Sequence, residues 1–441
     1  MLDIKLLREE PEKVKKAIAT KRADPKLVDA FLELDGEWRK LTQKIDELRA
    51  EQKKLSSERS VEAAKKNKEA IKEYENKIVD IEKEREFVWI QIPNIPDADV
   101  PVGSDETGNK VIRKQGEPKK YSFKPKEHLE LGEALDIIDV ERAGKISGTR
   151  FGYLKGGAAL LEFALIQHAL EVLRDEKILK SLADKVEKGY PAKPFIPVVP
   201  PVMIRPDVYR KTGRLGPGDE DEKYYIPRDD MYLIGSAEHT LAPLHMDEVL
   251  SEGDLPIRYV GFSTSFRREA GSYGKDTKGI LRVHQFDKLE IESFTTAENS
   301  RKEQDFIVSI QEYLMQSLEI PYQVVAICTG DMGGPDIHQI DIEAWLPGQP
   351  SSTGSGQGRY RETHTSDLIG DYQARRLGTK VKRAGGKTEL VHMNDATVFA
   401  IGRAVIAILE NYQTKDGTIE VPKVLQKYVG EKIIRKSSDV G

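Results

Sequence analysis

Charged and aromatic residues are closely spaced in the segment from Phe266 to Glu290, FRREAGSYGKDTKGILRVHQFDKLE. Arg267 offers a planar fork of hydrogen-bond donors that suits phosphate and carboxylate oxygens. Glu269 can accept from an adenine amino group or a neighbouring arginine, and Phe286 can stack on a purine face. The turn between them carries two glycines and three cations, Gly271, Gly274, Lys275, Lys278 and Arg282. These residue types in this order predict a site for a nucleoside triphosphate.

The segment resembles the second signature motif of the class II aminoacyl-tRNA synthetases, in the form FRxEAGS...DTxGxxRxHQFxKxE that the seryl-tRNA synthetases carry. A charged hairpin on a protein surface would explain the charges, but not their order beside the glycines, Phe286 and Glu290. The resemblance implies ATP-dependent activation of L-serine to seryl-adenylate. It also implies transfer of the seryl group to the 3′ end of tRNA(Ser), and leaves open whether tRNA(Sec) is served too.

The amino-acid end of this family's site is matched by other segments. Ser236, Ala237 and Glu238 follow the strand-like MYLIG and match a Thr-x-Glu element that binds the amino acid, with serine in place of threonine. Glu290 matches a glutamate of the serine pocket, and Thr397 matches the position beside the serine hydroxyl. The implied serine-binding residues are Ser236, Ala237, Glu238, Arg267, Glu290 and Thr397.

The phosphate end is matched by the ETHT segment, Glu362 to Thr365, and by DATVFAIGR, Asp395 to Arg403, which is expected to head the helix of the third class II motif. The resemblance implies catalytic roles for Arg267, Glu362 and Arg403. Glu362 and Thr365 are the implied ligands of Mg²⁺ bound with ATP, because hard oxygen donors suit that ion, and no zinc is expected. The implied ATP-binding residues are Arg267, Arg268, Glu269, Phe286, Glu362, Thr363, His364, Thr365 and Arg403.

Two departures from the family pattern fall inside these segments. THTSDL, Thr363 to Leu368, stands where Ile-Ser-Ser-Cys-Ser-Asn is usual, and Asp395 stands where asparagine is usual. His364 is expected to be a solvated histidine, since its spacing from the other histidines fits no metal site. These departures leave a second function open, that of a catalytically weakened paralogue that binds RNA or an amino acid as a regulator. A ligase that loads a carrier protein is a further alternative, and the helical arm described next counts against it.

Apolar residues near the N-terminus follow two heptad patterns, Leu27 to Leu55 and Ala64 to Ile92, separated by the polar stretch Ser56 to Lys68. Two helices of about 30 residues joined there would form an antiparallel coiled-coil arm roughly 45 Å long. One opening helix is expected from Leu2 to Thr20. Lysines and arginines at the tip of the arm and on the opening helix, beside an adenylate-forming motif, predict contact with tRNA.

The segment Ile92 to Gly103, rich in proline, is expected to link residues 1–100, a tRNA-binding domain, to residues 101–441, a class II catalytic domain. The fold class is α+β, with an antiparallel β-sheet flanked by helices. A helix from Ala158 to Arg174 before a strand ending near Pro201 resembles the first class II motif, which forms the interface of a homodimer. The GSGQG of the loop Gln349 to Gln357 lacks the residues of a phosphate loop.

The composition limits the remaining possibilities. Of the 441 residues, 38% are hydrophobic and 32% charged, with a net charge of -5 and a single cysteine, Cys328, which excludes an internal disulfide and a cysteine-cluster metal site. No apolar run of about 18 residues is present, so no membrane partner is expected. A cytoplasmic location is expected, with ATP, L-serine and tRNA(Ser) as substrates.

Overall fold

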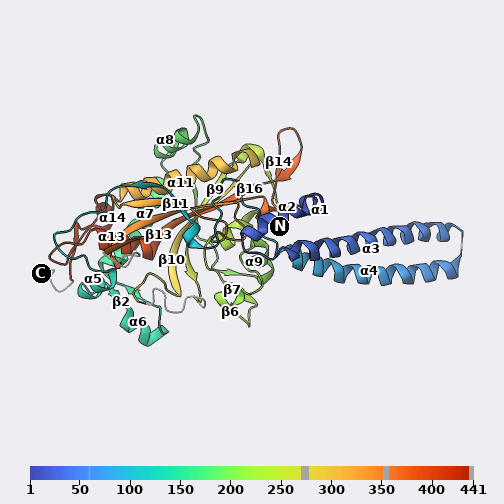
Figure 1. Cartoon of the computed structure of the whole chain (residues 1–441), viewed down its shortest axis with the longest axis horizontal. Helices are drawn as coiled ribbons and strands as arrows, with labels where there is room; N and C mark the ends of the chain where they lie inside the picture. The colour runs from blue at the N-terminus through green and yellow to red at the C-terminus, as the bar shows by residue number, and fades with distance from the viewer. Residues whose placement is uncertain (59, 270–277, 351–356, 437–441) are drawn as a thin grey trace. The chain divides into compact units, whose positions relative to one another are not determined.

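The chain divides into two compact units, residues 1–96 and residues 97–441 (Figure 1). The computed structural model describes residues 1–58, 60–269, 278–350 and 357–436. Gly271, Gly274 and Lys275 of the predicted nucleotide turn, and most of the Gly/Ser loop, lie outside the described residues. Among the helices of the described chain, none combines the length and the apolar character needed to cross a bilayer.

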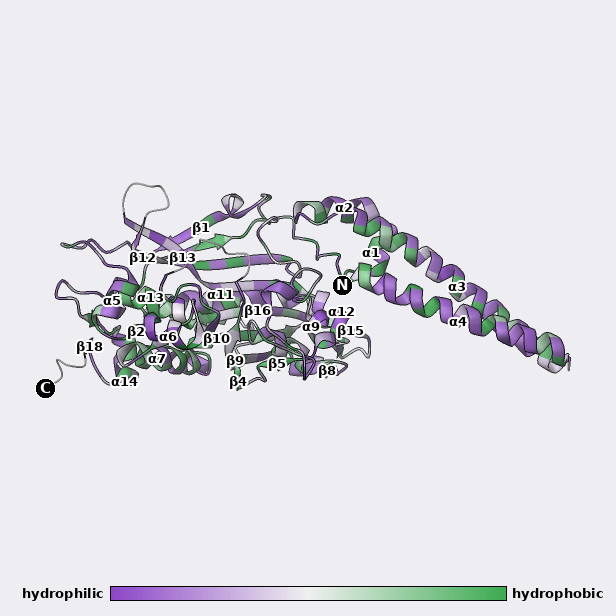
Figure 2. Ribbon diagram, turned by 90° about the horizontal axis from the view of Figure 1, so that it is seen from below, coloured by the Kyte–Doolittle hydropathy of each residue, from purple (hydrophilic) through white to green (hydrophobic). Residues whose placement is uncertain are grey.

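The first unit is helical and contains the predicted antiparallel arm, which Figure 1 shows as the pair α3 and α4. Hydrophilic and hydrophobic residues alternate along both helices (Figure 2). The polar stretch expected to form a turn is mostly helical, because α3 continues to Ser57 and α4 begins at Val61. The helices are α1 Ile4–Glu9, α2 Pro11–Thr20, α3 Lys26–Ser57 and α4 Val61–Trp89.

The prediction of one opening helix was wrong, because Pro11 divides it into α1 and α2. Proline has no N–H to donate and disfavours helical conformation in the preceding residue. Glu10 accordingly leaves the helical region, with φ -129° and ψ 46°. Proline is tolerated in the first turn of the next helix, so α2 starts at Pro11.

A buried polar group interrupts the heptad pattern of the arm. Asp35 is fully buried on α3 and accepts hydrogen bonds from both Nε and Nη2 of Arg8 at 2.8 Å. Arg85 of α4 donates to the same carboxylate at 3.0 Å, and Arg39 lies 3.2 Å from it. Although burial favours the protonated carboxyl, these arginines lower the pKa of Asp35. The base of the arm is therefore fixed by an ion-pair cluster as well as by apolar packing.

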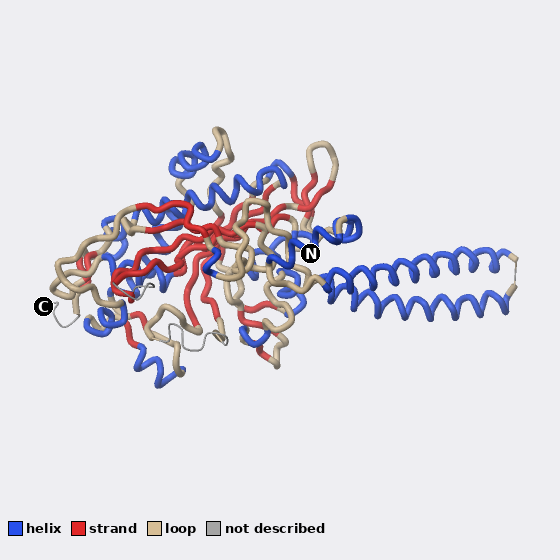
Figure 3. Tube along the Cα trace, in the orientation of Figure 1, coloured by secondary structure: helices blue, strands red, loops and turns tan. Residues whose placement is uncertain are grey.

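The second unit is built on an eight-stranded sheet in the order β1-β11-β12-β13-β16-β10-β9-β4 (Figure 3). Neighbouring strands are antiparallel except β4, which pairs parallel with β9. The predicted α+β class with an antiparallel sheet is confirmed. The strands are β1 Lys110–Gln115, β4 Ile196–Val198, β9 Ile257–Phe266, β10 Gln285–Thr295, β11 Tyr322–Ala326, β12 His338–Pro350, β13 Gln357–Gly370 and β16 His392–Ala400.

Helices α7, α11 and α13 build the main apolar core with one face of this sheet. Leu289 and Ile291 of β10 belong to that core, so the alternate residues Lys288 and Glu290 project from the opposite face. The helices of this unit are α5 His128–Ala134, α6 Val140–Ser147, α7 Gly157–Val172, α8 Glu176–Val186, α9 Pro206–Thr212, α10 Glu238–Leu241, α11 Ser300–Ser317, α12 Tyr372–Leu377, α13 Ile401–Asn411 and α14 Gln426–Val429.

Short strands complete the unit. The strands β2 and β3 pair with each other, and α6 lies between them in the chain. The strand β7 precedes the Ser236–Glu238 segment, as expected. The short strands are β2 Ile138–Asp139, β3 Tyr153–Leu154, β5 Met203–Ile204, β6 Tyr225–Ile226, β7 Met231–Leu233, β8 Val249–Ser251, β14 Lys380–Lys382, β15 Thr388–Leu390, β17 Ile419–Glu420 and β18 Ile433–Ile434.

Candidate active site

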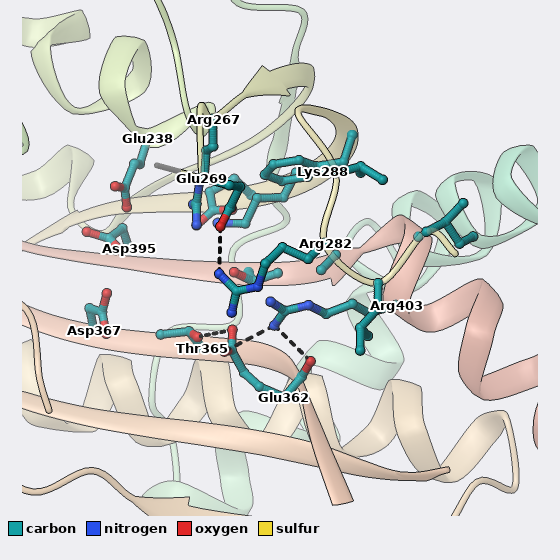
Figure 4. Close-up of a pocket in the computed structure, with 18 of the residues that line it drawn as sticks. Glu238, Arg267, Glu269, Arg282, Lys288, Glu362, Thr365, Asp367, Asp395 and Arg403 are labelled. Atoms are coloured by element: carbon teal, nitrogen blue, oxygen red, sulfur yellow. Dashed lines mark hydrogen bonds and ion pairs between the residues drawn. The ribbon is translucent and has the colours of Figure 1, made fainter. Parts of the chain in front are cut away.

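A pocket lies on the sheet face opposite the main core, and strands β10, β13 and β16 supply much of its wall (Figure 4). Nine of the site residues predicted from the sequence meet there, although they are far apart in the chain. The predicted residues that line the pocket are Glu238, Arg267, Glu269, Phe286, Glu290, Glu362, Thr365, Thr397 and Arg403.

A β-bulge in β13 brings Glu362 onto the pocket face. Thr365 pairs with Asp341 and His364 with Ile342, but Glu362 pairs with Glu343, so Thr363 is an extra residue in the ladder. In a regular strand without the bulge, the three-residue separation would put Glu362 and Thr365 on opposite faces. With it, Thr365 Oγ1 lies 3.3 Å from Glu362 Oε1.

A second register shift lies in β16, where Phe399 pairs with Leu289 but Thr397 pairs with Glu290. Thr397 and Ala400 consequently both face the pocket, although they are three residues apart. Gln311 of α11 supports both irregular strands from behind, because its Nε2 donates to the carbonyl oxygens of Thr365 at 2.9 Å and Thr397 at 2.7 Å. The two bulges therefore position the site.

The third-motif segment was expected to head a helix, but this expectation was wrong for most of it. Asp395 and Thr397 lie on strand β16, and only its end, with Arg403, belongs to α13. Asp395 pairs with Glu292 of β10 in the ladder, and Thr397 with Glu290. Strand geometry thus places these side chains in the pocket beside each other.

Carboxylates dominate the amino-acid end. Glu238, Glu290 and Asp395 are all buried, and each has one carboxylate oxygen within 4.8 Å of the others, an arrangement that could hold a metal ion or an ammonium group. Lys288 Nζ lies 2.6 Å from Glu290 Oε2 and donates to Ser236 Oγ at 3.2 Å. Burial raises the pKa of Glu290 despite the nearby lysine.

Arg267 and Phe286 lie together at the predicted nucleotide platform, with the guanidinium 5.4 Å from the ring centroid. Arg267 Nε donates to the Gly235 carbonyl at 3.1 Å. Glu269 pairs with Arg282 Nη1 at 2.6 Å, which was one of the two possibilities expected for it. Its φ of 53° is unusual for a residue with a side chain, and such strained positions are concentrated at functional sites.

At the phosphate end, Arg403 Nη1 lies 3.1 Å from Glu362 Oε2 and 3.0 Å from the Glu362 carbonyl oxygen (Figure 4). Although partial burial opposes ionisation, Arg403 lowers the pKa of Glu362. Glu362 and Thr365 together offer oxygen donors of the kind that magnesium prefers. This end of the pocket is suited to phosphate oxygens and a hard cation.

Several predicted residues are not brought into the pocket. Thr363 donates to the Ile342 carbonyl at 3.1 Å, and His364 is fully buried against Phe399, with ring centroids 5.2 Å apart. The expectation of a solvated His364 was therefore wrong, because the bulge turns it to the core face. Arg268 lies by Tyr224, 5.9 Å from its ring.

Ser236 and Ala237 are buried immediately before α10 and do not line the pocket. Ser236 instead accepts a hydrogen bond from Lys288. Their placement fits a role in holding Glu238 and Lys288 in position.

Three charged residues of the pocket had not been assigned from the sequence: Arg214, Lys288 and Asp367. Lys288 stood within the quoted motif, and Asp367 within the departing THTSDL segment, so each had a signal that could have identified it. Arg214 follows the left-handed Gly213 that ends α9, and nothing in the sequence near it indicated a site.

Comparison with known proteins identifies the family. Residues 1–96 match the seryl-tRNA synthetase N-terminal domain, and residues 223–412 match the class II core domain of the G, H, P, S and T synthetases. The chain is 40% identical over 446 residues to the serine–tRNA ligase of Acidothermus cellulolyticus, with 99% of each chain covered. The chain belongs to the seryl-tRNA synthetase family.

Other members of the family agree over the whole chain. The serine–tRNA ligase of Dictyoglomus thermophilum is 41% identical over 442 residues, covering 98% of each chain. The crystal structure of the Pyrococcus horikoshii seryl-tRNA synthetase complexed with ATP matches with a TM-score of 0.87 and 38% identity, over 99% of this chain and 100% of that one. The resemblance inferred from the motifs, and the class II fold, are thus confirmed.

Proposed function

We propose that this seryl-tRNA synthetase family member activates L-serine with ATP and transfers the seryl group to tRNA(Ser), using the pocket between Glu238 and Arg403. The convergence of the nine predicted residues in one pocket is the observation that carries the proposal. Full-length similarity to serine–tRNA ligases supports it independently. Of the departures that had kept a weakened paralogue open, Thr363 and His364 point away from the pocket, whereas Asp367 and Asp395 line it beside Arg214.

In the first step, a serine carboxylate oxygen attacks the α-phosphorus of ATP, and the bond from that phosphorus to the pyrophosphate oxygen breaks. Negative charge grows on the α-phosphate oxygens as the five-coordinate state forms. Arg267 is assigned to orient the carboxylate and the α-phosphate and to offset this charge. Arg403 is assigned to hold the γ-phosphate, and Phe286 to stack on adenine. Catalysis then rests on placement and charge, without a covalent enzyme intermediate.

In the second step, the terminal ribose hydroxyl of the tRNA attacks the acyl carbon of seryl-adenylate, and AMP leaves with the electron pair of the mixed-anhydride bond. The product is an ester to the tRNA. Magnesium carried with ATP fits Glu362 and Thr365, whose oxygens lie close together, and when bound it would offset phosphate charge.

Serine differs from alanine by one hydroxyl group, so selectivity depends on buried polar groups that need that hydroxyl. Glu290 and Thr397 are paired across β10 and β16 and both line the pocket. Alanine would leave their hydrogen-bonding groups without a partner, which is costly in a buried site. Threonine has to be rejected by space.

The helical arm is assigned to tRNA(Ser), and tRNA(Sec) remains a candidate for the same surface. The exposed tip carries Lys53, Lys54, Lys65, Lys66 and Lys68. Such a cluster favours phosphate contacts. The arm also argues against a ligase that serves a carrier protein. A cytoplasmic homodimer remains part of the proposal.

Pyrophosphate exchange with purified protein tests the proposal, with alanine, threonine and glycine compared against serine. Serine-dependent exchange at least 10²-fold above alanine is expected, because the site has polar groups directed at the hydroxyl. Exchange with serine, followed by charging of tRNA(Ser), would exclude the regulatory paralogue. A folded protein that exchanges with none of the four amino acids would overturn the proposed activity.

A further inference from the structure

Arg214 is surrounded by carboxylates at the amino-acid end of the pocket. Its Nε lies 3.1 Å from Glu238 Oε1, and its Nη2 lies 3.0 Å from Asp395 Oδ2 and 3.3 Å from Asp367 Oδ2. Asp336 is a fourth partner at 3.4 Å. These carboxylates come from α10, β13, β16 and the chain just before β12, so one guanidinium joins four segments. The arginine side chain itself is only 16% exposed.

Negative charge around this guanidinium exceeds the positive charge. Glu292 lies opposite Asp395 in the β10–β16 ladder, is fully buried, and neither of its carboxylate oxygens has a hydrogen-bond partner in the described structure. Glu290 approaches Glu238 and Asp395 within 4.8 Å, and Lys288 is its cation. Arg214 is consequently the cation placed among the acids on the Glu238 side of the pocket.

The pKa values of these carboxyl groups shift in different directions. Burial and the neighbouring Glu238 carboxylate raise the pKa of Asp395, and burial with neighbouring acids likewise raises the pKa of Asp367. Glu238 behaves in the opposite sense. Although burial opposes ionisation, Arg214 and the adjacent His239 hold the pKa of Glu238 well below its ordinary value. Among Glu238, Asp367 and Asp395, Glu238 is therefore the carboxylate that stays charged.

We propose that Arg214 is a positioning residue of the amino-acid subsite, which holds Glu238 in place and ionised so that Glu238 can accept the α-ammonium group of the substrate. The inference rests on the proposed function. Without the guanidinium, Glu238 would face several buried acids and lose its ion-pair partner at 3.1 Å, and it would take up a proton or turn away. The substrate ammonium would then lose its charged partner, whereas the ATP end of the pocket would be unchanged.

The substitution Arg214→Gln tests this, because glutamine keeps hydrogen-bonding groups and removes the charge. In pyrophosphate exchange, the KM for serine should rise roughly 10- to 100-fold, as expected when one partner of a buried ion pair is removed. The KM for ATP should change less than about threefold, because its pocket walls are elsewhere. The serine KM of the variant should also fall as the pH rises and Glu238 loses its proton, while that of the natural protein should depend less on pH.

A second variant separates positioning from folding. Arg214→Gln combined with Asp395→Asn removes one cation and one competing acid, so its serine KM should lie at least threefold below that of Arg214→Gln alone but more than twofold above the natural value. Arg258→Gln is the matched control. Arg258 is a fully buried arginine paired with Glu303 at 2.6 Å and is not a pocket residue, so its loss should lower stability without changing the serine KM.

An unchanged serine KM in Arg214→Gln would overturn the inference, as would equal increases in the KM values for serine and ATP. If the Arg214→Gln protein does not fold, the double variant is the test. A serine KM of the double variant within twofold of the natural value, at every pH, would also count against the inference. Absence of serine-dependent exchange in the natural protein would instead refute the proposed function, so the two failures are distinguishable.

Discussion

The bulge at Thr363 turns Glu362 towards the pocket. Substitution of Glu362 should therefore affect catalysis more than folding. Glu362→Gln removes the charge that pairs with Arg403 and that would meet magnesium. We expect serine-dependent exchange to fall roughly 10²- to 10³-fold, the range for loss of one electrostatic group at a reacting centre. Glu343→Gln is the control, because Glu343 pairs with Glu362 across β12 and β13 yet is not one of the residues lining the pocket. Equal losses in both variants would contradict the assignment.

His364 should make the protein sensitive to acid. Burial lowers the pKa of its imidazole from 6.5 to about 3, with Glu362 opposing, so the folded chain rejects a proton that the unfolded chain accepts below pH 6.5. Stability is then complete above pH 6.5 and declines as the pH falls towards 3. At ~1.4 kcal/mol for each pH unit, the loss through this residue is roughly 2 to 3 kcal/mol at pH 4.5.

The substitution His364→Leu checks this sign. Leucine removes the titrating group from a site that packs on Phe399, so the urea midpoint of the variant should change less between pH 7.5 and pH 4.5 than that of the natural protein. A larger decrease in the variant would contradict the assignment. Activity at pH 7.5 should be retained, because the histidine lies on the core side of β13.

His364 also shows where sequence reasoning fails at the residue scale. Alternation along a strand puts Glu362 and His364 on one face, and only the extra residue at Thr363 separates them. A bulge of this kind depends on pairing with β12, which is distant in sequence. Arg214 was missed for a related reason, since its four acidic partners come together only in the fold.

At the scale of elements, the heptad patterns predicted α3 and α4 well, because such a pattern depends on local burial. The third motif was less well predicted, because the family resemblance assigned the segment to a helix although Val398 and Phe399 favour a strand. Asp35 would have been taken as an ordinary polar position, although it binds three arginines.

Asp35 should therefore contribute strongly to the stability of residues 1–96. In Asp35→Asn, Arg8 and Arg85 lose a buried carboxylate, and we expect a loss of roughly 2 to 4 kcal/mol in the free energy of unfolding of this unit. Asp46→Asn removes an exposed acid of α3 whose ion pair measures 4.0 Å, and should change stability by less than about 0.5 kcal/mol. Chemical denaturation followed by circular dichroism on the two variants measures the difference; comparable values would contradict it.

The arm should be separable from adenylate formation. Replacing Asp46 to Asp80 by a short Gly-Ser linker leaves the apolar core of residues 1–96, which includes Leu7, Ile18, Phe31 and Ile92, outside the deletion. Serine-dependent pyrophosphate exchange is expected to remain within about threefold of the natural rate, because additive behaviour holds for independent modules. Aminoacylation of tRNA(Ser) should fall below detection. Loss of both activities in a folded variant would contradict separate roles.

At the scale of the whole molecule, the remaining expectation is a homodimer formed through the first-motif segment. Residues of α7 and of the strand region after it are apolar yet exposed, which is unusual for side chains of this size. They include Leu160 at 41%, Phe163 at 58%, Ile196 at 52% and Val199 at 87% exposed. A second copy of the chain that covers this face would remove the apolar area from water.

Phe163→Glu should therefore shift the protein from dimer to monomer, because a carboxylate in a desolvated interface costs several kcal/mol unless it is paired. Sedimentation equilibrium or light scattering at micromolar concentration measures the mass, with 49.7 kDa expected for one chain. Phe87→Glu is the matched control: Phe87 is 56% exposed on α4, so the same change there should leave the mass of the natural assembly unaltered. A dimer that persists in Phe163→Glu, or a natural protein that is monomeric, would contradict the first-motif interface. Neither result would affect the chemistry proposed for the pocket.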